Sequence, residues 1–135
     1  MSNNNYICPF SNIIINGKCS CQFSSRGYIA EKEFVTCDKE SASYECQKFY
    51  RALIENSDFV FNSHKKNSLS LGQQSKLKMG ALLYLQKQVS KIDITTIDNI
   101  YILFTKIKIH YQEFNNINYS DLMPTIAEYN LRKKN

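Results

Sequence analysis

Tryptophan is absent from this chain of 135 residues, and glycine and proline are scarce, with four and two residues. Folds built from many short strands use glycine and proline at their turns, so this scarcity argues against a sandwich. Phenylalanine and tyrosine, with eight and nine residues, have to supply the large core side chains. A chain of this length can bury a core without covalent links, and we expect a single domain over residues 1–135.

Long hydrophobic runs and features of a leader are also lacking. The segment Met1–Tyr6 has neither a basic nor an apolar stretch, and Ile13–Ile15 is too short to span a bilayer. We therefore expect a cytoplasmic protein that is not transmembrane and is at most peripheral to a membrane complex. Structural disulfides are rare in that reducing compartment, and five cysteines cannot all pair within one chain.

Cysteine does not occur after Cys46, so all five cysteines lie in the first third of the chain. Cysteines that serve only as core residues would not segregate in this way. The distribution predicts a cysteine module over residues 8–56 and a helical part over residues 71–135. From Cys8 to Ser25 there is little periodicity, and Asn16-Gly17 is a turn signal, so we expect an irregular loop there.

Helical periodicity dominates the remainder, because apolar residues recur three and four positions apart in four segments. These segments are Cys46, Phe49, Tyr50, Leu53 and Ile54; about Leu71 to Ser90; Ile100, Leu103, Phe104, Ile107, Tyr111 and Phe114; and Leu122, Ile126 and Tyr129. The predicted fold is mainly α, with the irregular cysteine-rich loop module docked on about four helices.

The start of the first helix bears on the chemistry. A helix that ran from Cys37 to Cys46 would hold their Cα atoms about 13 Å apart, too far to share one small site. We therefore predict that it begins later, with Ser41 or Ser43 as its N-cap.

Three further local features are predicted in the helical part. Thr95–Asp98 resembles a capping box for the third helix, and Ser120 is the expected cap of the last one. Gly80, in the interior of the second helix, is interpreted as a close approach to a neighbouring backbone.

The cysteines suggest a metal site. Thiolates suit zinc and iron–sulfur clusters, and four of them complete a tetrahedral zinc site or a four-iron cluster. Zinc modules usually supply pairs spaced C-x2–4-C, whereas this chain reads C-x10-C-x-C-x15-C-x8-C. The long separations favour a 4Fe-4S cluster over zinc, and Cys8-Pro9 adds weak support, since a ligating cysteine is followed by proline in some ferredoxins. Redox-active thiols and plain buried cysteines remain alternatives.

Five cysteines exceed the four that such a site needs. We expect only one of Cys19 and Cys21, which are two residues apart, to be a ligand.

A resemblance bears on this choice. The chain resembles a family of small uncharacterised bacterial proteins over about residues 8–88. The similar motifs are Cys8-Pro9-Phe10, Cys21-Gln22-Phe23, Arg26-Gly27, Phe34–Cys37, Cys46 and the helix Lys76–Gln86. The resemblance implies four shared cysteines, which match Cys8, Cys21, Cys37 and Cys46, and it leaves Cys19 as the departure and the alternative ligand. It implies no activity.

Other polar residues point to no second site. His64 and His110 have no ligand partner at metal-binding spacing, and we expect surface histidines. Acidic residues near the last cysteines are expected to form a solvated rim; they are Glu31, Glu33, Asp38, Glu40 and Glu45. Phe59–Phe61 is expected to be a short apolar anchor in the connection between the two parts.

Charge is divided unevenly along the chain. Residues 1–60 carry six Lys and Arg against seven Asp and Glu, whereas residues 61–135 carry eleven against five. The basic half is interpreted as a solvated helical face, with a patch for nucleic acid, an anionic membrane or an acidic protein as the alternative. Nucleic-acid binding has little support, because no recognition motif is present.

The predicted function is that of an iron–sulfur accessory or electron-transfer subunit, whose partner is a protein in a larger redox complex. An active site of its own is not indicated, because an all-cysteine shell leaves no open coordination position. The alternative is a zinc-stabilised helical adaptor that binds a protein partner.

Overall fold

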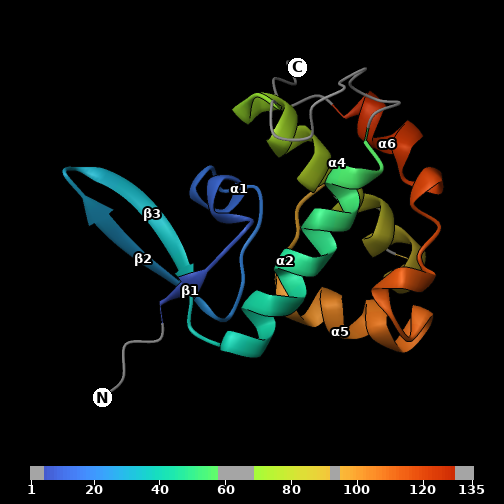
Figure 1. The fold of residues 1–135 in the computed structure, drawn as a ribbon, viewed down its shortest axis with the longest axis horizontal. Helices are drawn as coiled ribbons and strands as arrows, with labels where there is room; N and C mark the ends of the chain where they lie inside the picture. The colour runs from blue at the N-terminus through green and yellow to red at the C-terminus, as the bar shows by residue number, and fades with distance from the viewer. Residues whose placement is uncertain (1–4, 58–68, 92–94, 130–135) are drawn as a thin grey trace.

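The computed structural model describes residues 5–57, 69–91 and 95–129 (Figure 1). Phe59–Phe61 and His64 therefore lie outside the described residues. The first part of the chain holds β1 (Tyr6–Ile7), α1 (Ser11–Ile15), β2 (Ser24–Ile29), β3 (Lys32–Cys37) and α2 (Glu40–Glu55). The second holds α4 (Leu71–Ser90), α5 (Ile100–Tyr111), α6 (Met123–Glu128) and the 3-10 turns η2 (Phe114–Asn116) and η3 (Tyr119–Asp121). The prediction of a mainly α fold is confirmed.

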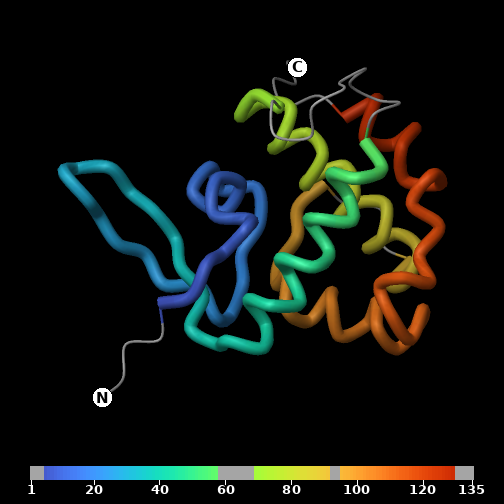
Figure 2. The backbone as a smooth tube through the Cα atoms, in the orientation of Figure 1, coloured from blue at the N-terminus to red at the C-terminus, as the bar shows by residue number. Residues whose placement is uncertain are grey.

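The N-terminal module is more regular than predicted. Its three strands form an antiparallel sheet in the order β1-β3-β2, and α1 occupies part of the segment expected to be a loop. In Figures 1 and 2 the hairpin of β2 and β3 projects away from the helices, with α1 between them. The irregular loop module is thus replaced by a small sheet and a short helix.

The hairpin turn explains why the sequence did not predict this sheet. Ile29 pairs with Lys32, so the loop has two residues, Ala30 and Glu31, and both have positive φ angles of 50° and 71°. Such a turn normally uses Asn-Gly, which adopts positive φ without strain. Opposite strands also pack closely at Gly27, where a Cβ atom would lie 2.6 Å from the Phe34 ring.

Helix α2 begins at Glu40, and its N-cap is Lys39, without a side-chain cap. The predicted cap at Ser41 or Ser43 is therefore wrong, although Cys37 does precede the helix at the end of β3. The Ser43 hydroxyl instead donates a 2.6 Å hydrogen bond to the Ile7 carbonyl, which links α2 to β1.

Helix α4 occupies the predicted range and begins with a capping box between Ser70 and Gln73. Its middle is buried almost all round, since Leu77, Met79 and Leu82 are fully inaccessible. The interpretation of Gly80 is confirmed, because a Cβ atom there would lie 2.6 Å from the Cα atom of Ile126 in α6.

The caps of the last two helices differ from the predictions. Asn99, not the Thr95–Asp98 box, caps α5, and its side chain accepts a hydrogen bond from the Tyr101 amide. Helix α6 starts at Met123 after Leu122, while the Ser120 hydroxyl bonds the Asn118 side chain. No helix in the described ranges is both long and apolar enough to cross a bilayer.

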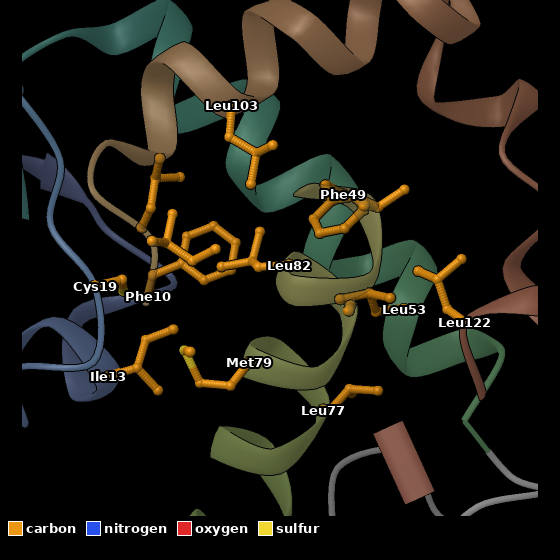
Figure 3. Packing of buried hydrophobic residues seen from close by; sticks show 14 of the residues in the cluster. Phe10, Ile13, Cys19, Phe49, Leu53, Leu77, Met79, Leu82, Leu103 and Leu122 are labelled. Carbon is orange, nitrogen blue, oxygen red and sulfur yellow. The ribbon is translucent and has the colours of Figure 1, made fainter. Parts of the chain in front are cut away.

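The core is one hydrophobic cluster that includes residues of both parts of the chain. Phe49 of α2 lies at its centre, with ring centroids of Phe104, Phe114 and Tyr119 at 5.2, 5.6 and 6.2 Å. Figure 3 shows that Phe10 and Ile13 point toward α4. These contacts pack the N-terminal module against the helices.

Candidate functional site

The sheet brings three cysteines to one end. Tyr6 of β1 and Ser24 of β2 both pair with Cys37, the last residue of β3. Cys8 follows β1 by one residue, and Cys21 begins the turn into β2, in which the Ser24 amide donates to the Cys21 carbonyl. The pairing register thus gathers thiols that are far apart in the sequence.

Helix α2 adds the fourth thiol. Its residues Ala42, Ser43 and Cys46 face the same space as Cys8, and the Ser43–Ile7 bond fixes the helix beside β1. Cys46 lies in the second turn of the helix.

One cavity of about 540 Å³ is lined by Cys8, Cys21, Cys37 and Cys46. Its remaining wall includes α5, whose Ile100, Tyr101, Phe104, Thr105, Lys108 and Ile109 contribute. The volume greatly exceeds the roughly 30 Å³ that one water occupies in the liquid. The cavity can therefore hold a group of several atoms.

Two hydrogen bonds and one aromatic contact position the Cys21 side of the cavity. The Gln22 amide donates to Asn99 Oδ1 at 3.3 Å, and Asn99 Nδ2 donates to Gln22 Oε1 at 2.9 Å. The Phe23 ring packs edge-on against Tyr101 at 4.7 Å between centroids. These contacts attach the segment after Cys21 to the start of α5.

Burial and the charges of neighbouring cysteines raise the pKa of three of these thiols, Cys8, Cys37 and Cys46. Burial raises the pKa of Cys8 to about 11, and the Cys21 and Cys37 charges add to the effect. The pKa of Cys46 is raised further, by burial first and then by Cys8, Cys21 and Cys37. Burial also raises the pKa of Cys37. Four thiolates in this space would repel one another, so their ionisation requires a compensating positive charge.

Cys19 takes a different position. It is buried in the core, at 4% exposure, forms an isolated parallel bridge with Ile97, and does not line the cavity. Figure 3 shows it beside Phe10 and Ile13. Cys19 thus lies in the core beside the cavity rather than in its lining, close enough for the Cys8 and Cys21 charges to raise its pKa. The role of the other four cysteines as ligands stays a prediction.

The described residues contain no group of three or more His, Cys, Asp and Glu side chains close enough to hold a metal ion, and no disulfide joins the five cysteines. A zinc ion bound at about 2.3 Å would require sulfur atoms about 3.8 Å apart. The thiols share a cavity, but they do not converge on one point. A bound metal group would have to be larger than one ion, or the thiols would have to move.

The acidic residues and His110 that the sequence analysis considered lie away from the cavity or at its edge. Glu45 lines the cavity and pairs with Lys108 at 3.5 Å, whereas Glu33 pairs with Arg26 on the hairpin. The predicted acidic residues are therefore divided between the hairpin and α2. His110 is exposed near the end of α5.

Sequence reasoning missed Lys78, which is buried at 5% exposure and interacts electrostatically with Cys8 and Cys19. Its signal in the sequence is a lysine inside the apolar stretch Leu77–Leu85. It also missed the contribution of α5 to the cavity wall.

Comparison with known proteins gives no match: no family model, curated protein or solved structure is similar to this chain. The resemblance of the cysteine motifs to a bacterial family stays a prediction.

Proposed function

We propose that this protein binds an iron–sulfur cluster through Cys8, Cys21, Cys37 and Cys46, and that it serves as an electron-transfer or accessory subunit. The observation that carries the proposal is that these four thiols, from four separate segments, line one cavity of about 540 Å³. Four thiolates are the donor set of a four-iron cluster.

The charge of the site supports a metal group. Buried thiols release their protons when a metal cation replaces them, and the positive charge of the metal then offsets the burial and the mutual repulsion that raise the pKa of Cys46. When bound, the cluster would supply one-electron redox chemistry. The protein's own contribution is to hold the four sulfur atoms and to exclude water with the α5 wall.

The edge of the cavity suits contact with another protein. Ile7 and Ile109 line it and are exposed at 65% and 76%. Exposed apolar side chains at the rim of a site are typical of surfaces that dock a partner. A redox partner seated there would lie directly beside the cluster, which is the arrangement that electron transfer needs.

The test is anaerobic reconstitution of the reduced protein with ferrous iron and sulfide, followed by iron and sulfide analysis and visible absorption spectroscopy. We expect brown protein with about four irons per chain, as a four-iron cluster requires. Colourless protein that instead takes up one zinc would overturn the cluster and support the zinc-stabilised adaptor.

Two matched variants test the ligand set. Cys21→Ser should abolish cluster uptake, whereas Cys19→Ser, two residues away, should leave the iron content unchanged, because Cys19 does not line the cavity. Equal losses in both variants, with circular dichroism showing that both are folded, would contradict the proposed ligand set.

A further inference from the structure

Strand β2 is an edge strand of the sheet, because in the order β1-β3-β2 it pairs with β3 on one side only. It is six residues long and contains no proline or lysine, which natural proteins often place on an edge to prevent further pairing. Tyr28 and Ile29 near its end are exposed at 68% and 69%. Figures 1 and 2 show the hairpin projecting away from the helical part. Among the described residues, no strand covers the outer side of β2.

The register of the hairpin shows which backbone groups of β2 point outward. The Asp38 amide donates to the Phe23 carbonyl at 2.8 Å, so these two residues form a hydrogen-bonded pair at the base of the hairpin. Hydrogen-bonded and non-hydrogen-bonded pairs alternate along an antiparallel ladder. Arg26 and Tyr28, three and five residues after Phe23, therefore belong to non-hydrogen-bonded pairs, and their N–H and C=O groups point away from β3.

A bond on the other strand agrees with this alternation. Val35, which lies opposite Arg26, donates its amide to Ser11 Oγ at 3.0 Å and not to β2. Within the described residues, the backbone groups of Arg26 and Tyr28 have no hydrogen-bond partner. Two N–H groups and two C=O groups are therefore available to a further strand.

A second copy of the same strand fits this edge best in one antiparallel register. A two-fold axis at Gly27 places Arg26 of each copy opposite Tyr28 of the other, so that all these outward groups pair across the axis. An axis at Arg26 would place two arginines opposite each other, and like charges in that position are destabilising. An axis at Tyr28 would place Arg26 opposite Ala30, which belongs to the turn and has a positive φ angle.

The side chains in this register are complementary on both faces of the sheet. On one face Arg26 of each copy lies beside the ring of Tyr28 of the other, and a guanidinium is attracted to the face of an aromatic ring. On the other face the two Gly27 residues meet. The Phe34 ring already covers Gly27, where a Cβ atom would lie 2.6 Å from it. The pair of glycines therefore leaves room for the Phe34 rings of both copies.

We propose that this chain forms a two-fold symmetric dimer, in which β2 pairs antiparallel with β2 of a second copy and joins the two three-stranded sheets into one. Strand addition at an exposed sheet edge is a common mode of association, because main-chain hydrogen bonds provide affinity and side-chain pairs provide specificity. Both copies use the same surface, so the pairing closes on itself. It involves none of the four cysteines that line the cavity and does not depend on a bound cluster.

The first experiment is sedimentation velocity of the full chain at increasing concentration. Two paired hairpins bury less surface than the roughly 1,200 Å² of a standard interface, so we expect a dimer that dissociates on dilution. The sedimentation coefficient should therefore rise from the monomer value toward the dimer value as the concentration increases. A coefficient that stays at the monomer value up to about 1 mM would overturn the proposal.

The variant Tyr28→Pro tests whether the dimer uses this edge. It removes an outward N–H group but no hydrogen bond between β2 and β3, and proline is tolerated on edge strands. Each copy loses one donor, so half of the main-chain bonds across the axis are lost. We expect the dissociation constant to rise at least tenfold. An unchanged constant in a variant that circular dichroism shows to be folded would overturn the proposal, because the copies would then associate elsewhere.

Two charged variants test the register, and they decide the matter if Tyr28→Pro fails to fold. Position 28 of each copy lies opposite Arg26 of the other, so Tyr28→Glu should associate several times more tightly than Tyr28→Lys. The difference should shrink at high salt. Tyr44 on α2, exposed at 60%, is the matched control, and Tyr44→Glu and Tyr44→Lys should dimerise equally. Equal dissociation constants for the two Tyr28 variants would overturn the proposed pairing.

Discussion

Alanine at two glycines of α4 should change stability in opposite directions. Gly72 lies in the first turn, where a Cβ atom would meet nothing closer than the Ser70 hydroxyl at 3.9 Å. Gly80 lies in the interior, where a Cβ atom would be 2.6 Å from the Cα atom of Ile126 and 2.9 Å from its Cγ1 atom. The two sites receive the same substitution on the same helix, so the difference between them isolates the packing against α6.

The magnitudes follow from two opposing effects. Replacing glycine by alanine in a helix stabilises the folded state by up to about 1 kcal/mol. We expect most of this stabilisation at Gly72. At Gly80 the nearest atom belongs to the backbone, so α6 itself has to shift, and overpacking of this kind costs roughly 1–3 kcal/mol. Partial loss of the burial of Ile126, which is fully inaccessible, adds up to about 1.5–3 kcal/mol. We expect Gly80→Ala to destabilise the protein by about 1–3 kcal/mol after the helix gain is subtracted.

Urea unfolding followed by far-ultraviolet circular dichroism measures both variants against the wild type. Gly72→Ala should move the midpoint upward and Gly80→Ala downward. In an Ile126→Ala background the cost of Gly80→Ala should shrink, because the contact with Cγ1 is gone. Stabilisation by Gly80→Ala equal to that by Gly72→Ala would show that α4 and α6 are not in contact at this point.

Two more predictions concern the region of the cavity. Ser43→Ala should destabilise the protein by about 0.5–1.5 kcal/mol, because it removes the hydroxyl that donates to the Ile7 carbonyl of β1, whereas Ser41→Ala, at an exposed position, should have little effect in the same urea assay. The melting temperature of the apoprotein should fall between pH 9 and pH 11. Burial raises the pKa of Cys8 to about 11 and that of Cys19 to about 12, both from 9.0, so their stabilising contribution is complete below pH 9 and is lost as the pH rises through those values. The opposing contribution of Lys78, whose pKa burial lowers from 10.5 to about 8, is smaller than that of the two thiols, and a flat melting profile would contradict this balance.

The helices were predictable where local periodicity and burial agree. The range Leu71–Ser90 of α4 and the buried stripe of Ile100, Leu103, Phe104 and Ile107 on α5 are confirmed. The sheet was not predictable, because Ala30-Glu31 is not a turn signal and β1 pairs with a strand far along the chain. Tertiary pairing overrode the weak local preference there.

The predictions of the helix caps were wrong for a physical reason. The hydroxyl of Ser43 is used to bind the Ile7 carbonyl and so does not cap α2. Asn99 caps α5 and also exchanges hydrogen bonds with Gln22. Both arrangements depend on partners that are distant in the sequence. Local capping preferences carry no information about such partners.

The grouping of four cysteines around one cavity was predictable from their segregation in the sequence, but the burial of Lys78 was not. In the sequence Lys78 is one lysine among many, because the residues next to it on the chain give no sign of its hydrogen bond to Asn12. Its burial results from α4 being packed on several sides.

The cavity depends on the folded core rather than on local loops. Cys8 and Cys37 are placed by the sheet, Cys46 by α2, and Cys21 by the bonds between Gln22 and Asn99. Each placement is fixed by backbone pairing or by contacts that contain no metal, and the α5 wall is anchored in the same core as Phe49. In small zinc modules, by contrast, the metal supplies the folding free energy. The apoprotein should therefore fold cooperatively without metal, and binding of a cluster should add stability to a fold that already exists.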